Sequence, residues 1–125
     1  MNIYESAEDY LEAILALRER QGYVRSIDIV RQKNITKPSV SIAMKKLREN
    51  GYIEMDPEGF ITLLSPGEEI ARRIYNRHRL IRTFLQGLGV SEENANADAC
   101  KIEHDISEET FQKMIEHARQ HGLCE

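Results

Sequence analysis

The sequence lacks several features that would assign it to a narrow class of protein. It has no tryptophan, three prolines and two cysteines, Cys100 and Cys124, among 125 residues. Two cysteines are too few for a disulfide framework, so we expect reduced thiols. No apolar run approaches the about 18 residues of a membrane helix, and residues 1–10 carry acids where a signal peptide would be basic and apolar. We therefore expect a cytoplasmic protein without a membrane partner.

An excess of basic charge is also missing, because the net charge is −4. The charges are, however, unevenly distributed along the chain. Residues 25–48 hold seven basic side chains against one acidic, whereas residues 91–125 hold three basic against nine acidic. A basic segment joined to an acidic one indicates two separate tasks and keeps a nucleic-acid partner open.

The first half of the chain has the pattern of a winged helix-turn-helix. Apolar spacing and turn residues indicate where each element begins and ends. In chain order we expect a helix over 5–20, a short helix capped by Ser26, a helix from Thr36 or Lys37 to Asn50, and strands over 52–55 and 60–64 joined by a turn at 56–59.

Only helices are expected in the second half. Serines that suit helix N-caps stand at the start of three helical patterns, namely Ser65 with Glu68 three residues later, Ser91 and Ser107. The pattern predicts helices that end near Gln86, Asp105 and Gln120. The fold class is therefore mainly α with a small β-hairpin wing, with a winged helix-turn-helix domain over 1–64 and a linker helix and helical domain over 65–125.

The third helix is expected to enter the major groove of double-stranded DNA with its N-terminus first. Hydroxyls and basic side chains suited to phosphates and base edges gather around that end. The expected DNA-binding residues are Arg25, Thr36, Lys37, Pro38, Ser39, Ser41, Lys45 and Lys46. Asp56 and Glu58 at the wing tip would repel phosphate, so wing contacts should be weak. The alternative is a winged helix that binds only protein.

A cluster suited to a transition metal stands near residue 100. Cys100, Glu103 and His104 form the pattern C-x-x-E-H, which projects a thiolate, a carboxylate and an imidazole to one side of a helix. This donor set suits first-row transition metals, whereas calcium and magnesium prefer oxygen alone. The structural alternative for Cys100 is a small apolar residue in the core.

Five further side chains could bind metal. Asp9 and Glu12 share a face of the first helix but could equally belong to a solvated acidic surface. His78 lies on an apolar stripe of the long helix, where a packed, hydrogen-bonded histidine is the ordinary alternative. His117 and His121 have i, i+4 spacing and indicate exposed helix surface, with adventitious zinc binding as the alternative.

Several segments make the chain resemble the metal-dependent repressors typified by the diphtheria toxin repressor and the manganese transport regulator. They are "AEDYLEAI" at 7–14, "TKPSVSIAMKKLRENGYI" at 36–53, "LSPGEEIARRIYNRHRLIRTFL" at 64–85 and "DACKIEHDIS" at 98–107. The resemblance implies a winged-helix domain joined by the long helix to a helical dimerisation domain. It also implies a homodimer, a palindromic operator and control of metal-homeostasis genes, without the SH3-like domain of the larger members.

The resemblance assigns metal ligands residue by residue. The positions that match the family's ligands are Asp9, Glu12, His78, Cys100, Glu103 and His104. Asp9 is typical of manganese-type members, whereas Cys100 matches the iron-type cysteine at a position where manganese-type members usually carry glutamate. Arg82 stands where iron-type members have an acidic ligand of their ancillary site, which argues against such a site here.

We expect this mixed ligand set to switch DNA binding. A metal held by ligands from both domains should fix the angle between them. The thiolate favours Fe²⁺ over Mn²⁺ as the cellular effector, and Zn²⁺ or Co²⁺ could bind in vitro. We expect no enzyme activity and no small-molecule substrate. The alternatives are a metal-independent winged-helix regulator and a metal-dependent hydrolase, for which no general base stands at a distinctive spacing.

Overall fold

The computed structural model describes residues 3–123, with the side chains of residues 3–5 left aside, so Cys124 lies outside the described residues. The described residues up to Arg73 form one compact unit, and those from Ile74 onward form a second. The elements in chain order are α1 (Ile3–Gln21), α2 (Ser26–Lys33), α3 (Lys37–Glu49), β1 (Ile53–Met55), β2 (Ile61–Leu63), α4 (Ser65–Gly87), α5 (Glu92–Asp105) and α6 (Glu108–Gln120).

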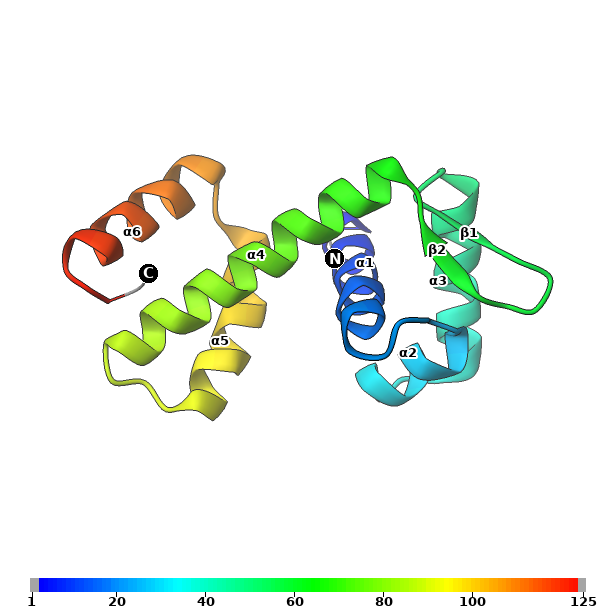
Figure 1. The fold of residues 1–125 in the computed structure, drawn as a ribbon, viewed down its shortest axis with the longest axis horizontal. Coiled ribbons are helices and arrows are strands. Elements are labelled where there is room, and N and C mark those ends of the chain that lie inside the picture. The colour runs from blue at the N-terminus through cyan, green and yellow to red at the C-terminus, as the bar shows by residue number, and fades with distance from the viewer. Residues whose placement is uncertain (1–2, 124–125) are drawn as a thin grey trace. The chain divides into compact units, whose positions relative to one another are not determined.

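The first unit is the expected winged helix-turn-helix. Figure 1 shows α1, α2 and α3 gathered together, with the β1–β2 hairpin beside α3. Their shared core includes Leu11 and Ile14 of α1 and Met44 of α3, each no more than 1% exposed. Burial of these apolar side chains supplies most of the driving force that holds short helices together. The expected fold class is confirmed.

The helix-turn-helix turn has the backbone that its sequence favours. Asn34 adopts the left-handed conformation with φ of 53° and ends α2, which asparagine tolerates better than most residues. Thr36 caps α3, because its hydroxyl accepts a hydrogen bond from the Ser39 amide at 3.3 Å, and Pro38 lies in the first turn.

One expected cap is wrong. Arg25, not Ser26, is the N-cap of α2, and Ser26 is its first helical residue. The Asp28 carboxylate accepts a hydrogen bond from the Arg25 amide at 2.9 Å. The aspartate three residues on therefore stabilises this helix start in place of the serine hydroxyl.

The hairpin forms as expected, but each strand is shorter than its apolar pattern. β1 and β2 pair antiparallel, with Ile53 opposite Leu63. The Ile61 amide donates to the Val24 carbonyl at 2.8 Å, and Arg25 and Phe60 form an isolated bridge. The segment before α2 therefore adds a third line of backbone contacts to the wing.

The expected cap of α4 is also wrong. Ser65 is the first helical residue, and the Glu68 amide donates to the Leu64 carbonyl at 2.8 Å. The Glu68 carboxylate accepts from Arg18 at 2.8 and 2.9 Å, so it stabilises contact with α1. These two guanidinium hydrogen bonds, with Arg72 adding to them, lower the pKa of Glu68.

The second unit packs three helical segments around a small core. Ile81 of α4, Ala99 of α5, and Phe111 and Ile115 of α6 are buried together. Ser91 and Ser107 cap α5 and α6 as expected, by accepting hydrogen bonds from backbone amides at 3.3 and 3.1 Å. Among residues 3–123, no helix combines the length and apolar character that crossing a membrane requires.

Candidate functional site

Three of the expected metal ligands meet inside the second unit. His78 comes from α4, and Cys100 and Glu103 come from the same side of α5. Nδ1 of His78 lies 2.9 Å from Oε2 of Glu103 and 3.7 Å from Sγ of Cys100. The i, i+3 spacing on α5 is what turns the thiol and the carboxylate toward one imidazole.

The spacing of these donor atoms fits one transition-metal ion. One donor atom from each of the three residues lies within 4.8 Å of the others. A tetrahedral ion with bonds of about 2.0–2.3 Å to nitrogen, oxygen and sulfur holds its ligand atoms roughly 3.3–3.6 Å apart. Small side-chain movements would therefore bring all three to bonding distance. A thiol and an imidazole suit a transition metal better than calcium or magnesium, which prefer oxygen ligands alone.

The cluster is electrostatically prepared for a cation. Glu103 is fully buried, and a buried carboxylate needs positive charge or hydrogen bonds around it. Hydrogen bonding to Cys100, and then to Glu103, raises the pKa of His78 to about 10, although burial of the ring acts in the opposite direction. A metal ion must displace this proton, so metal binding and proton release are coupled.

His104 adds an imidazole on the other side of the same carboxylate. Its Nε2 lies 3.3 Å from Oε1 of Glu103, and the His104 side chain is 1% exposed. Each oxygen of the Glu103 carboxylate therefore faces a histidine ring. A carboxylate held in this way can bind one ion or bridge two.

Arg77 supports this cluster, although it was not among the residues that the sequence predicted for the site. It is 7% exposed, and its guanidinium donates to the carbonyl oxygens of Glu103 and Ile106, each at 3.1 Å. The guanidinium also lies 5.2 Å from the centre of the Phe111 ring. Because Arg77 follows the buried Ile74 by three residues and precedes the buried Ile81 by four, helical spacing alone could have placed it inward.

The two remaining expected ligands belong to the first unit. Asp9 and Glu12 lie on α1, and both are partly buried. On the same helix, Glu8 forms a salt bridge with Arg73 at 2.8 Å. The acidic face of α1 is thus not uniformly solvated, which was the structural alternative for these residues.

The expected DNA-binding residues are all exposed. On α3 these are Lys37, Pro38, Ser39, Ser41, Lys45 and Lys46, with Thr36 at its cap. Ile42, on the same helix, is 59% exposed although it is large and apolar. A basic, hydroxyl-rich helix surface with an apolar side chain at its centre is suited to phosphates, base edges and thymine methyl groups.

Arg25 has a different environment from the α3 residues. Its guanidinium donates to the Glu58 carbonyl at the wing tip and lies 4.9 Å from the centre of the Phe60 ring. Phe60 in turn makes an edge-on contact with Tyr23. Arg25 therefore holds the wing, whether or not it also reaches a phosphate.

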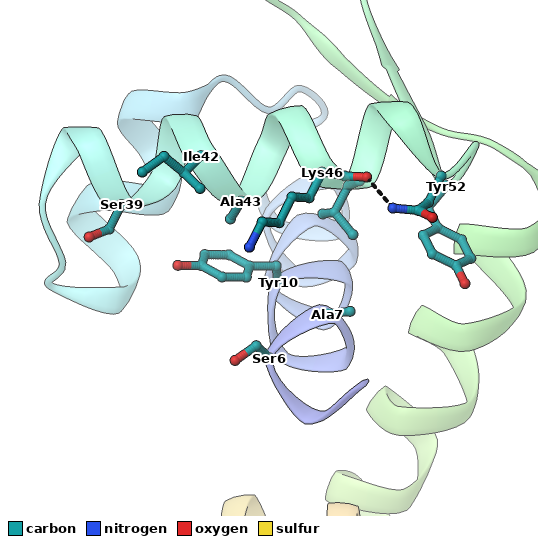
Figure 2. Close-up of a pocket in the computed structure, with 10 residues that line it drawn as sticks. Ser6, Ala7, Tyr10, Ser39, Ile42, Ala43, Lys46 and Tyr52 are labelled. Carbon is teal, nitrogen blue, oxygen red and sulfur yellow. Dashed lines mark hydrogen bonds between the residues drawn. The ribbon is translucent and has the colours of Figure 1, made fainter. Parts of the chain in front are cut away.

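A pocket of about 490 Å³ lies between α1 and α3 (Figure 2). Its lining is mostly apolar, and it includes Ser39 and Lys46 of the exposed α3 surface. Figure 2 shows the Lys46 side chain extending toward Tyr10 of α1. Asn50 also lines the pocket, and its side-chain amide donates to the Lys46 carbonyl at 2.7 Å.

Comparison with known proteins agrees with this arrangement. The family model described as "Iron dependent repressor, N-terminal DNA binding domain" matches residues 2–60, and "Iron dependent repressor, metal binding and dimerisation domain" matches residues 65–124. The transcriptional regulator MntR of Salmonella typhimurium is 35% identical over 118 residues, which are 94% of this chain and 75% of that protein.

Solved structures give the same result. T. acidophilum IdeR superimposes with a TM-score of 0.78 and 32% identity over 88% of this chain. A manganese-dependent transcriptional repressor in complex with manganese superimposes with a TM-score of 0.81 and 27% identity over 94% of it. The chain spans 52% and 53% of these two proteins, about half of their length. On the family models and the MntR match together, the chain belongs to the iron-dependent repressor family of metal-dependent transcriptional regulators.

Proposed function

We propose that this protein is a repressor of metal-homeostasis genes that binds a palindromic operator as a homodimer when Fe²⁺ occupies the His78–Cys100–Glu103 cluster. The observation that carries the proposal is the meeting of thiol, imidazole and buried carboxylate around one point. The exposed basic surface of α3 supplies the DNA-binding half. Cytoplasmic location follows from the same role.

The residues of the cluster would divide the work of holding the ion. Cys100 and Glu103 supply negative charge and His78 a neutral nitrogen, while His104 orients the carboxylate from its second oxygen. A bound divalent ion would supply the positive charge that the buried carboxylate and the thiolate require. On the family resemblance we propose Asp9 and Glu12 as further ligands.

Metal can switch DNA binding only through a difference in affinity. The ion must bind the DNA-competent arrangement more tightly than the others. Moving a population from 1:99 to 99:1 requires about 5.5 kcal/mol of such preference. A site with several protein ligands is able to supply a difference of this size, whereas one or two exposed carboxylates are not.

An anaerobic DNA-binding assay tests the proposal. DNA would be enriched from a random-sequence library with the full chain and Fe²⁺, and the enriched sequence would then be used in a mobility-shift assay. We expect binding with Fe²⁺, loss of binding with a chelator, and an inverted repeat in the selected DNA. Binding that ignores both metal and chelator would instead support a metal-independent winged-helix regulator.

Mn²⁺ is the second candidate effector, and the names of the MntR relatives favour it. The choice depends on Cys100, because a thiolate favours Fe²⁺ over Mn²⁺ more than a carboxylate does. We expect the natural protein to respond to lower concentrations of Fe²⁺ than of Mn²⁺, and Cys100→Glu to reverse that order. If the natural protein already prefers Mn²⁺, the iron assignment is wrong and the metal switch remains.

A further inference from the structure

Two histidines outside the proposed metal cluster lie against each other at the end of α6. His117 is in the last turn of the helix, and His121 is its C-cap. Their ring centroids are 4.2 Å apart, with the ring planes tilted by 40°. Both residues are exposed.

The backbone beneath this pair is held in place. The His121 amide donates to the His117 carbonyl at 3.2 Å, and the Leu123 amide donates to the Ala118 carbonyl at 2.7 Å. Leu123 packs on the core of the second unit. A Cβ at Gly87 would lie 2.5 Å from the Leu123 carbonyl oxygen, so the backbones of α4 and of this turn are in direct contact. The two imidazoles therefore project from an anchored turn.

The spacing of the rings suits chelation of a metal ion. An ion that bonds imidazole nitrogens at about 2.0–2.1 Å holds two of them roughly 3 Å apart. Rings whose centroids are 4.2 Å apart reach that separation by small rotations of the side chains. Two histidines at i, i+4 on a helix are a recurrent pair of zinc ligands for this reason.

The surroundings of the pair also favour a cation. The C-terminal end of a helix carries partial negative charge, which attracts cations in its last turn. This partial charge adds to the affinity that the imidazoles provide.

We propose that His117 and His121 form a second, exposed binding site for divalent ions that prefer imidazole, namely Cu²⁺, Ni²⁺ and Zn²⁺. The site is separate from the His78–Cys100–Glu103 cluster and holds its ion with two protein nitrogens and water. Mn²⁺ does not occupy it, because Mn²⁺ stands at the weak end of the affinity order for nitrogen ligands. The chain thus takes up more equivalents of Cu²⁺ or Zn²⁺ than of Mn²⁺.

Titration of the full chain with Cu²⁺ tests the site, with bound metal counted by equilibrium dialysis and nitrogen ligands by electron paramagnetic resonance. We expect His117→Ala/His121→Ala to lose one Cu²⁺ equivalent and each single variant to weaken that equivalent at least tenfold. Gln120→Ala, an exposed neighbour, is the matched control and keeps it. Cys100→Ala, which alters the other cluster, also keeps it.

Two results would overturn the proposal. One is a double variant that binds as many Cu²⁺ equivalents as the natural protein, with the same affinity and the same nitrogen count. The other is a loss of Mn²⁺ uptake in the double variant, which would place the pair in the main metal site. Circular dichroism checks folding, and His117→Gln/His121→Gln repeats the test should the alanine variant unfold.

Discussion

Arg77 donates a hydrogen bond to the backbone carbonyl of Glu103 at 3.1 Å, so a buried cation holds the residue whose carboxylate faces His78. The same guanidinium nitrogen donates to the carbonyl of Ile106, the C-cap of α5. The last carbonyls of a helix have no partner within it. Arg77 therefore ends α5 and fixes the backbone of a proposed metal ligand with one side chain.

Replacement of Arg77 by alanine should destabilise the protein by about 2–4 kcal/mol, because buried carbonyls lose their donor and a cavity opens beside Phe111. Urea denaturation of the metal-free protein measures the change. Arg79→Ala, two residues along α4 and exposed, should stay within about 0.5 kcal/mol of the natural protein. Equal stability of the Arg77 and Arg79 variants would show that the buried guanidinium does not stabilise α5.

The raised pKa of His78 predicts a pH dependence of the metal-free protein. Because the pKa rises from 6.5 to about 10 on folding, its contribution to stability is fully present below pH 6.5 and is lost as the pH rises through 10. The free energy of unfolding, measured in urea with a chelator, should fall across this range by on the order of 1–3 kcal/mol. His78→Gln should flatten the profile. Parallel profiles for the two proteins would contradict the assignment.

Cys100→Ala should lower the affinity for Fe²⁺ by at least about 100-fold, because even residues that only support metal ligands contribute 10–100-fold. The affinity is measured by titrating Fe²⁺ anaerobically in the mobility-shift assay with operator DNA. Cys100 is exposed, so the variant should fold normally, and its melting temperature without metal serves as the control. Unchanged activation would show that Cys100 does not bind the activating ion.

Lys45→Ala should weaken binding to all DNA sequences and reduce the salt dependence of binding by about one counterion, since the slope is near −0.9 per phosphate contact. Lys45 is exposed on α3 and is not among the residues that line the pocket between α1 and α3. The measurement is the operator affinity at several salt concentrations. A loss confined to particular sequences would place Lys45 on a base edge instead.

Arg25→Ala should behave differently, because its guanidinium already contacts the Glu58 carbonyl and the Phe60 ring. We expect a modest loss of DNA affinity with an unchanged salt slope, and faster amide exchange in β1 and β2. Lys45→Ala is the comparison. It should leave amide exchange in β1 and β2 unchanged and reduce the salt slope of DNA binding. A reduced slope for Arg25→Ala would assign this arginine to a phosphate.

The elements of this fold were predictable where a local signal fixes them. The hydroxyls of Thr36, Ser91 and Ser107 cap helices as expected, because each stands directly before a helical pattern. Ser26 and Ser65 carry the same signal, but the cap of α2 falls one residue earlier and α4 begins at Ser65 itself. Residue preferences for the N-cap do not determine which of several neighbouring residues becomes the cap.

The sequence predicted which residues come together at the candidate site, but it did not predict the contacts that hold them there. The C-x-x-E-H spacing places Cys100 and Glu103 on one side of α5, and His78 of α4 faces both. That Glu103 is fully buried, and that Arg77 holds its backbone, depends on the packing of α4 and α6 around α5. The sequence around an arginine on an apolar stripe does not indicate which groups its guanidinium will contact.

The uneven charge along the chain bears on the rate at which the proposed repressor would find DNA. The basic segment 25–48 attracts the phosphate backbone, while the acidic segment 91–125 is repelled by it. Under the proposed function, DNA therefore approaches the basic segment more readily than the acidic one, and the association rate gains without any added contact in the final complex. Since the effect is long-ranged, it disappears when salt shortens the screening length to about 10 Å or less.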